Sequence, residues 1–268
     1  MKKLDHLSNI YNNYDTFVID LWGVIHNGIK LNDGAVNVTD KLFHNSKKVV
    51  FLSNAPRPSE NVRNFLREMK MKEEYLKNII TSGEAAMHAI NQNMFGKNFY
   101  HLGPIRDESI FYKIKDNKRD LGTSDFILCT GLFEKKENDL EFYKEFLKDH
   151  TSKKMICTNP DLIVHRGQVE EYCAGSIAKI FESLGGEVVY FGKPHKEIYK
   201  MCFSNKEKVL AIGDNLRTDI KGANNLQIDS IFISNGVHRK EFKHESELDE
   251  LLKKYKVKAN YFQTELNW

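Results

Sequence analysis

The sequence predicts an α/β protein built on a parallel sheet. Short apolar, β-branched runs alternate with segments of helical periodicity along the chain, which is the pattern of βαβ units. Several of these runs end directly in polar residues or glycine, as the strands of open α/β sheets do where they bind ligands. With 268 residues, the chain can form one large domain or two small ones.

The first part of the chain contains three expected strands and two expected helices. The strands are short apolar runs at residues 16–20, 48–52 and 79–81. One helix is expected at 36–45, and a second begins at Pro58. Apolar residues with the 3.6-residue period of this second helix are Val62, Phe65, Leu66 and Met69.

The middle of the chain repeats the alternation and is expected to form a second α/β unit. The expected strands are 98–102, 126–130 and 155–158. The expected helices are 84–94, 138–148 and 172–184. Gly185 and Gly186 close the last of these helices, and an extended run at 188–191 leads back into the first unit.

The last part of the chain contains expected strands at 209–212 and 230–233, a helix at 218–225 and an amphipathic helix at 245–254. No linker, internal repeat or low-complexity tract marks a domain boundary. A discontinuous first domain with an inserted second domain is therefore inferred from the placement of the motifs described below.

Composition excludes several classes of function. The net charge of +3 is too small to indicate a nucleic-acid partner. The start of the chain has no apolar signal-peptide region, and no stretch has the ~18 apolar residues that a membrane span needs. The four cysteines are widely spaced, which suits a reducing compartment. We therefore expect a cytoplasmic protein with neither a nucleic-acid nor a membrane partner, and leave open whether it forms a homo-oligomer.

Asp20 is the most informative residue, because it ends an apolar run just before Leu21-Trp22-Gly23. A carboxylate at this place in an open sheet faces the ligand site. It can attack phosphorus to form an aspartyl-phosphate, which is one of the nucleophilic roles of carboxylates. Capping of the following turn is the alternative for the motif taken alone.

Two further segments carry groups that suit a phosphoryl ligand. Ser53 and Asn54 follow the second expected strand and offer a hydroxyl and backbone amides. Lys193 lies between Gly192 and Pro194, which restrict the backbone and suit a fixed point charge. Taken alone, either segment is also compatible with an ordinary turn.

The segment from Gly213 to Asp219 places Asp214 and Asp219 directly after a strand. Mg²⁺ prefers about six oxygen ligands and takes one or two carboxylates from a protein. Asp20, Asp214 and the carbonyl oxygen of Trp22 could supply the protein's share. Asp219 could be a ligand or an anchor behind the ligands, and capping by both acids is the alternative.

In this order and at these strand ends, the four segments resemble the haloacid dehalogenase superfamily. Within it, the chain is similar to subfamily IIA, the NagD-like and p-nitrophenylphosphatase-like hydrolases. The resemblance runs from Thr16 to about Phe262. Its motifs are Asp20-Leu21-Trp22-Gly23-Val24, Phe51-Leu52-Ser53-Asn54, Gly192-Lys193-Pro194-His195 and Gly213-Asp214 with Thr218-Asp219-Ile220 and Gly222-Ala223. Thr81-Ser82-Gly83 and Thr158-Asn159-Pro160-Asp161 resemble the start and middle of that subfamily's cap.

This resemblance implies a Rossmann-like parallel-sheet core formed by residues 1–81 and 190–268, with an α/β cap at 82–189. It implies Mg²⁺-dependent hydrolysis of a small phosphate ester. Asp20 is then the nucleophile, Ser53 and Lys193 hold the phosphoryl group, and Asp214 binds the metal. Further candidates for contact with the substrate are Asn54 and, from the cap, Asn159, Asp161 and Arg166.

Trp22 is where the chain departs from this family. Phosphatases of the superfamily carry a second Asp at this position, which protonates the leaving oxygen. An indole N–H donates a hydrogen bond but exchanges no proton at neutral pH. His26 is the titratable residue nearest in sequence, and His165 and His195 are other candidates to replace the acid.

Three functions are compatible with these residues. The first is a phosphohydrolase or phosphotransferase that acts on a small metabolite. The second is a phosphate-ligand-binding protein or low-activity pseudoenzyme of the same fold, which the loss of the acid at Trp22 favours. The third is dehalogenase-like chemistry, which needs no Mg²⁺ and is disfavoured by the pair Asp214 and Asp219.

Overall fold

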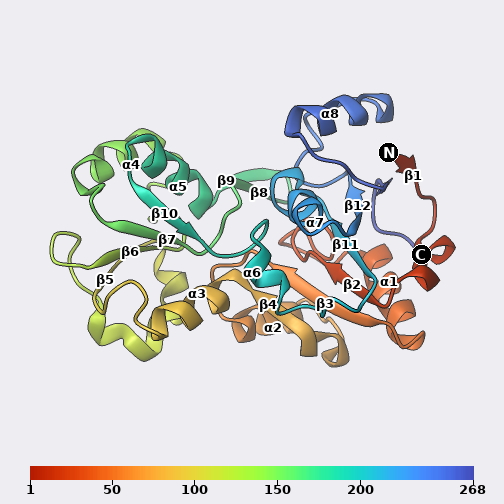
Figure 1. Ribbon diagram of the computed structural model, residues 1–268, viewed down its shortest axis with the longest axis horizontal. Helices are drawn as coiled ribbons and strands as arrows, with labels where there is room; N and C mark the ends of the chain where they lie inside the picture. The colour runs from red at the N-terminus through yellow and green to blue at the C-terminus, as the bar shows by residue number, and fades with distance from the viewer.

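The computed structural model describes all 268 residues, which form two parallel sheets and a separate antiparallel hairpin (Figure 1). The larger sheet has seven strands in the order β1-β13-β12-β11-β2-β3-β4. Its strands are β1 Lys2–Lys3, β2 Thr16–Ile19, β3 Lys48–Ser53, β4 Ile79–Thr81, β11 Val209–Gly213, β12 Asp229–Ile233 and β13 Tyr261–Gln263. Every pair in this sheet is parallel, so all carboxyl ends lie at one edge.

The smaller sheet has four parallel strands in the order β10-β7-β6-β5. Its strands are β5 Phe99–Leu102, β6 Phe126–Cys129, β7 Lys154–Cys157 and β10 Glu187–Tyr190. The hairpin consists of β8 Ile163–Arg166 and β9 Val169–Tyr172. In Figure 1 this hairpin lies between the part of the molecule that holds the small sheet and the part that holds the large one.

Helices connect the strands and cover the sheets. The helices are α1 Asp33–His44, α2 Ser59–Glu68, α3 Ser82–Asn91, α4 Leu140–Leu147, α5 Ala174–Ser183, α6 Lys196–Tyr199, α7 Lys221–Leu226 and α8 Leu248–Tyr255. Helical turns of the 3₁₀ type add further segments, among them Ile105–Asn117, which is interrupted by non-helical backbone at Phe111 and Ile114. None of the helices is long and apolar enough to cross a membrane.

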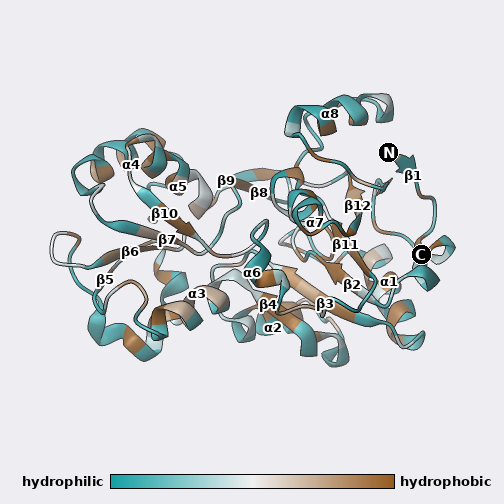
Figure 2. Ribbon diagram, viewed as in Figure 1, coloured by the Kyte–Doolittle hydropathy of each residue, from teal (hydrophilic) through white to brown (hydrophobic).

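Burial explains why the strands read as continuous apolar runs in the sequence. All four residues of β2 are buried, because helices cover a parallel sheet on both faces. The largest apolar cluster has 24 buried residues and packs around β2, β3, β11 and β12. The apolar colour of these strands and the polar outer surfaces of the helices can be followed in Figure 2. A second cluster of 13 residues fills the space between the small sheet and α4 and α5.

The parallel-sheet α/β fold with its second α/β unit is confirmed. The large sheet takes its strands from residues 2–81 and 209–263, and the small sheet from residues 99–190. The division into a core of 1–81 and 190–268 and a cap of 82–189 remains our proposal for the domain boundaries.

The structure differs from the expected elements at one functionally important place. Residues 163–172 form the β8–β9 hairpin, so Tyr172 ends a strand and the following helix begins at Ala174 rather than at residue 172. The short strands β1 and β13 at the edge of the large sheet were not expected either. Both consist of two or three residues, too few to show a period of two.

Candidate active site

The carboxyl ends of two neighbouring strands bring Asp20 and Asp214 together. β2 and β11 are adjacent and parallel, with Ile19 opposite Ile212. Asp20 continues the ladder by donating its backbone N–H to the carbonyl oxygen of Ile212, at 2.9 Å. The chain leaves β11 at Gly213, so Asp214 follows at the same edge of the sheet. This is the ligand-binding edge of an open α/β sheet.

Asp20, Asp214 and Asp219 form a buried cluster of carboxylates. One oxygen of each lies within 4.8 Å of the others. The ammonium group of Lys193 lies 2.5 Å from Oδ1 of Asp20 and 2.7 Å from Oδ1 of Asp219. All four side chains are almost completely buried. One cation thus faces three acids in a region from which water is largely excluded.

This imbalance of charge shifts the pKa values of the cluster. Burial raises the pKa of Asp20 to about 8, although Lys193 opposes the shift. Burial, with repulsion from Asp20 and Asp219, also raises the pKa of Asp214. For Lys193, burial alone would lower the pKa, but the neighbouring carboxylates outweigh it and raise the pKa. The site has an excess of negative charge that a divalent cation would relieve.

Backbone groups surround Asp214 closely. Its Oδ2 accepts a hydrogen bond from the N–H of Val237, at 2.7 Å. A Cβ atom at Gly23 or Gly236 would lie 2.1 Å from the same Oδ2, which is well inside van der Waals contact. Gly23 also has a φ of +90°, which glycine adopts without strain. Glycine is therefore required here for close approach of the chain to the carboxylate.

Asp219 acts as an anchor for Lys193 in this structure. Its Oδ1 lies 2.7 Å from Nζ of Lys193, and its Oδ2 accepts the N–H of Asn215 at 3.0 Å. Both carboxylate oxygens thus have donors. Of the two roles that the sequence leaves open for Asp219, this arrangement favours the anchor over the metal ligand.

Ser53 and Asn54 lie at the end of β3, beside the carboxylates. Both are buried and line the same cleft as Asp20. The side-chain amide of Asn54 is paired with the backbone of Lys193: its Oδ1 accepts the Lys193 N–H at 2.8 Å, and its Nδ2 donates to the Lys193 carbonyl at 3.2 Å. Asn54 therefore fixes the segment that carries the lysine. Oγ of Ser53 accepts the N–H of Ala55, which leaves its own proton free to donate.

Asn159 and Asp161 reach the site from the chain that leaves β7. Oδ1 of Asp161 accepts hydrogen bonds from Nδ2 of Asn215 and Oγ1 of Thr218, each at 3.0 Å. Oδ1 of Asn159 accepts the N–H of Asp161. Burial raises the pKa of Asp161, against the attraction of Lys193. Both residues line the cleft, and Asp161 also links the middle segment of the chain to the loop after β11.

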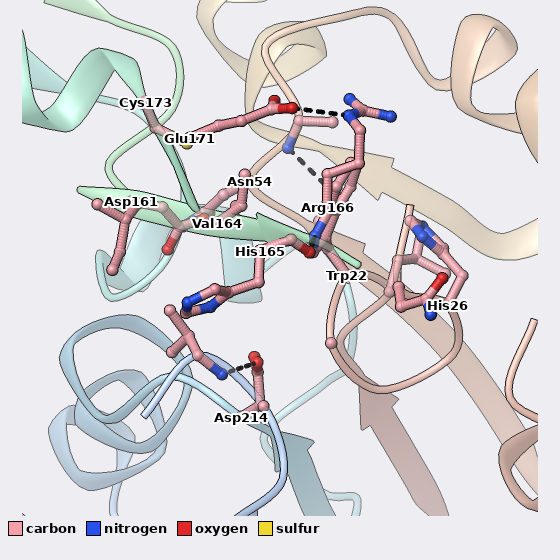
Figure 3. A pocket seen from close by; sticks show the side chains of 18 of the residues that line it. Trp22, His26, Asn54, Asp161, Val164, His165, Arg166, Glu171, Cys173 and Asp214 are labelled. Atoms are coloured by element: carbon pink, nitrogen blue, oxygen red, sulfur yellow. Dashed lines mark hydrogen bonds and ion pairs between the residues drawn. The ribbon is translucent and has the colours of Figure 1, made fainter. Parts of the chain in front are cut away.

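A cleft of about 1230 Å³ opens above these groups. Its walls come from the ends of β2 and β3, from the loop after β11, and from the β8–β9 hairpin. Figure 3 shows Trp22, His26, His165, Arg166 and Asp214 around this space.

Trp22 points toward the hairpin. Its Nε1 donates a hydrogen bond to the carbonyl oxygen of His165, at 2.9 Å. The guanidinium of Arg166 lies 5.0 Å from the centre of the indole ring, a cation–π distance. The side chain at the position of the missing acid therefore contacts the β8–β9 hairpin.

The three candidate histidines differ in their surroundings. His26 is buried, and its Nδ1 accepts the N–H of Gly28 at 3.1 Å. Burial and nearby Arg166 lower the pKa of His26 to about 4. The ring of His195 stacks on that of Tyr190, with the ring centres 5.6 Å apart, and it does not line the cleft. His165 is buried, lines the cleft, and has no hydrogen bond to either ring nitrogen.

Two features of the cleft could not be predicted from the sequence. One is the hairpin, whose four-residue strands show no alternation of apolar and polar residues and whose only local signal is the glycine at 167. The other is the ion pair between Nε of Arg57 and Oδ1 of Asp107, at 2.5 Å, with Asp107 almost fully buried. No local pattern connects Arg57 with Asp107, because they are fifty residues apart.

Comparison with known proteins identifies the family. Residues 17–114 match the family model of haloacid dehalogenase-like hydrolases, and residues 190–261 match a second model described as HAD-hydrolase-like. The two matched segments contain Asp20, Ser53, Lys193 and Asp214. The chain belongs to the haloacid dehalogenase superfamily. The resemblance that the motifs indicated is thereby confirmed.

Individual members of the superfamily are similar over most of the chain. An acid sugar phosphatase of Staphylococcus epidermidis is 26% identical over 237 residues, which cover 84% of this chain and 88% of the relative. A haloacid dehalogenase-like hydrolase from Brucella suis has a TM-score of 0.85 and 26% identity, with 98% of this chain and 99% of that one covered. A p-nitrophenyl phosphatase from Archaeoglobus fulgidus, with a TM-score of 0.73, 20% identity and coverage of 94% and 97%, shows the same fold. The chain is a HAD-like hydrolase of the phosphatase type.

Proposed function

We propose that this HAD-like hydrolase cleaves small phosphate monoesters through a covalent intermediate on Asp20, with Mg²⁺ as its metal. The observation that carries the proposal is the buried group formed by Asp20, Asp214 and Lys193, whose two aspartates line the cleft. The acid sugar phosphatase of Staphylococcus epidermidis supports phosphorylated sugars as the substrate class.

The carboxylates suit a divalent metal. Hard cations prefer carboxylate and carbonyl oxygens, and Mg²⁺ keeps several waters beside one or two carboxylates. Asp20, Asp214 and the carbonyl of Trp22 would hold the ion, and Asp219 would hold Lys193 beside it. When bound, Mg²⁺ would neutralise charge on the phosphoryl oxygens and on the two aspartates.

Each residue of the site has its own role in the proposed reaction. A carboxylate oxygen of Asp20 attacks phosphorus, the bond from phosphorus to the ester oxygen breaks, and an aspartyl-phosphate forms. Water then attacks this phosphorus and releases inorganic phosphate and the free carboxylate. Lys193 balances charge on the phosphoryl group, and the free hydroxyl proton of Ser53 donates to one of its oxygens. Asn54 keeps Lys193 in place.

The cleft has room for more than the phosphate. Ligand sites typically have volumes of ~300–1,000 Å³, so a space of about 1230 Å³ accommodates a sugar phosphate with its water. Asn159 and Asp161 remain proposed contacts for the part of the substrate beyond phosphorus. The four buried, unpaired cysteines support a reducing compartment, and we keep the cytoplasm as the proposed location.

The test is release of phosphate from a panel of sugar, nucleoside and aryl monophosphates with Mg²⁺. We expect turnover by the wild type and a loss of at least ~10³-fold in Asp20→Asn, because the amide keeps the shape but is a poor nucleophile. Asp149→Asn, at an exposed position in a helical turn, is the matched control and should retain activity. Binding of phosphate esters without any turnover would instead identify a binding protein of this fold.

A further inference from the structure

We propose that His165 transfers the proton to the leaving oxygen of the substrate, and that Trp22 positions His165 for this task. The inference rests on the proposed function and deepens it. It assigns a residue to the step for which the nucleophile loop of this chain offers no acid. The two residues belong to different parts of the fold, the loop after β2 and the β8–β9 hairpin.

The imidazole of His165 is buried but makes no hydrogen bond. Only 6% of the residue is exposed, yet neither ring nitrogen makes a hydrogen bond. Buried polar side chains nearly always have a partner, and leaving one without a partner costs free energy. His165 lines the cleft, and Figure 3 shows its ring extending from the hairpin on the side of Asp214, away from His26. A polar group of the substrate is the partner that this arrangement lacks.

The other histidine of the cleft, His26, uses one ring nitrogen to hold its own loop. Nδ1 of His26 accepts the N–H of Gly28. Its ring packs edge-on against Trp22 and Phe65, with ring centres 5.1 and 5.4 Å apart. His26 is thus a neutral ring that supports its own loop. Of the two histidines that line the cleft, only His165 has both ring nitrogens without a hydrogen bond, because His26 uses its Nδ1 within its own loop.

Several contacts hold the hairpin over the nucleophile loop. Besides the bond from Trp22 to the His165 carbonyl, the N–H of Gly167 donates to the carbonyl of Asn27 at 3.0 Å. Nη2 of Arg239 donates to the carbonyl of Gly167 at 2.8 Å. These bonds fix the backbone on both sides of Arg166 and so determine where the imidazole of His165 lies.

The proposed step balances in protons. The imidazolium of His165 gives its N–H proton to the ester oxygen as the bond from that oxygen to phosphorus breaks. The neutral imidazole then takes a proton from the water that attacks the aspartyl-phosphate, and the imidazolium is restored. One residue thereby serves both half-reactions, as a general acid and then as a general base.

Three charged residues act on His165. Glu170 is its partner across the hairpin, and Oε2 of Glu170 lies 3.5 Å from Nε2 of His165. This carboxylate favours the imidazolium, whereas burial and the cations Arg239 and Lys240 disfavour it and lower the pKa of His165. The hairpin thus places a carboxylate beside the imidazole of His165.

The first experiment measures how His165→Asn affects substrates with different leaving groups. Hydrolysis of a sugar phosphate, whose leaving oxygen needs a proton, should fall ~10²-fold. Hydrolysis of 4-nitrophenyl phosphate, whose leaving group departs as an anion, should change little. His88→Asn, at an exposed position of α3, is the matched control.

The second experiment tests Trp22 as a positioning residue. Trp22→Phe keeps an aromatic ring but removes the N–H that holds the His165 carbonyl. It should lower sugar-phosphate turnover more than 4-nitrophenyl phosphate turnover, in the same sense as His165→Asn. Combined with His165→Asn it should add little. Trp268→Phe, the same change at the other tryptophan of the chain, should leave both substrates unaffected.

The outcomes separate this inference from the proposed function. Equal loss on both substrates in His165→Asn, or full activity of His165→Gln, would overturn proton transfer by His165, because Gln can form a hydrogen bond but cannot exchange a proton. Absence of turnover in the wild type would overturn the proposed function, and this inference with it. Selective loss on the sugar phosphate would support both.

Discussion

The indole nitrogen of Trp22 donates a hydrogen bond to the carbonyl oxygen of His165, at 2.9 Å and across 143 positions of the chain. This bond joins the loop that carries the nucleophile to a hairpin that covers the cleft. Gly28 makes room for it, since a Cβ atom there would lie 2.5 Å from the indole ring. The contact between Trp22 and the hairpin therefore depends on the absence of a side chain at Gly28.

Gly28→Ala should destabilise the protein more than Gly185→Ala does. Both glycines have positive φ, +83° and +90°, so both substitutions carry a similar backbone strain of ~1–2 kcal/mol. Gly185 has open space around its Cβ position, whereas Gly28 faces the indole. Urea unfolding of the two variants gives the difference, and proteolysis within residues 163–172 should increase only in Gly28→Ala. Equal losses of stability would show that the indole moves aside without cost.

Lys193→Met should lower the free energy of unfolding by ~3–5 kcal/mol, because it leaves buried carboxylates without their cation. Adding Asp219→Asn should recover part of this loss, because one of the uncompensated charges disappears. Lys179→Met is the control. Its ion pair with Glu182 is at the surface, so the loss there should stay below ~1 kcal/mol. A similarly small effect at Lys193 would mean that water enters the site freely.

Mg²⁺ should raise the melting temperature of the wild type but not that of Asp214→Asn. Ligand binding to the folded state alone stabilises it by mass action, and the variant lacks a proposed ligand. Without metal, Asp214→Asn should melt at the wild-type temperature or a few degrees above it, because repulsion from Asp20 and Asp219 is reduced. Melting curves with Mg²⁺ and with a chelator test both statements. The same Mg²⁺ shift in wild type and variant would remove Asp214 from the metal site.

Stability in saturating Mg²⁺ should fall as pH decreases from about 6.5 to 4. Burial lowers the pKa of His26, His101 and His238 to about 4 in the folded chain. In the unfolded chain a histidine has its ordinary pKa of about 6.5. Between pH 6.5 and 4 the unfolded chain therefore binds more protons than the folded chain, and each histidine can contribute up to ~3 kcal/mol to the loss of stability. Mg²⁺ is needed because the raised pKa values of Asp20 and Asp214 act in the opposite direction.

The effect of one histidine can be isolated with His101→Gln. His101 is buried in the small-sheet unit, where its Nε2 is 2.9 Å from Oγ1 of Thr130. Urea unfolding at several pH values should give a flatter dependence on pH for this variant than for the wild type. A dependence as steep as that of the wild type would mean that His101 is not held neutral by burial.

Much of the fold could be predicted because its signals are local. The apolar run before Asp20 is one continuous strand that is buried on both faces, and period and length are enough to recognise such strands. The local sequence does not indicate the β8–β9 hairpin, and its periodicity predicts that Tyr172 begins a helix. Each of its strands has four residues, and its packing against the nucleophile loop has no counterpart in the local sequence.

The sequence by itself determined that Asp20 and Asp214 follow strand ends and, through the family resemblance, that Trp22 stands where an acid is expected. Strand ends can be read from hydrophobic patterning, and parallel strands place their carboxyl ends at one edge. Only the tertiary structure decided that Asp219 holds Lys193, that Trp22 holds the hairpin, and that the imidazole of His165 is buried without a hydrogen bond. These relations join residues that are far apart in the chain. They depend on how separately folded segments pack together, and no local periodicity records that packing.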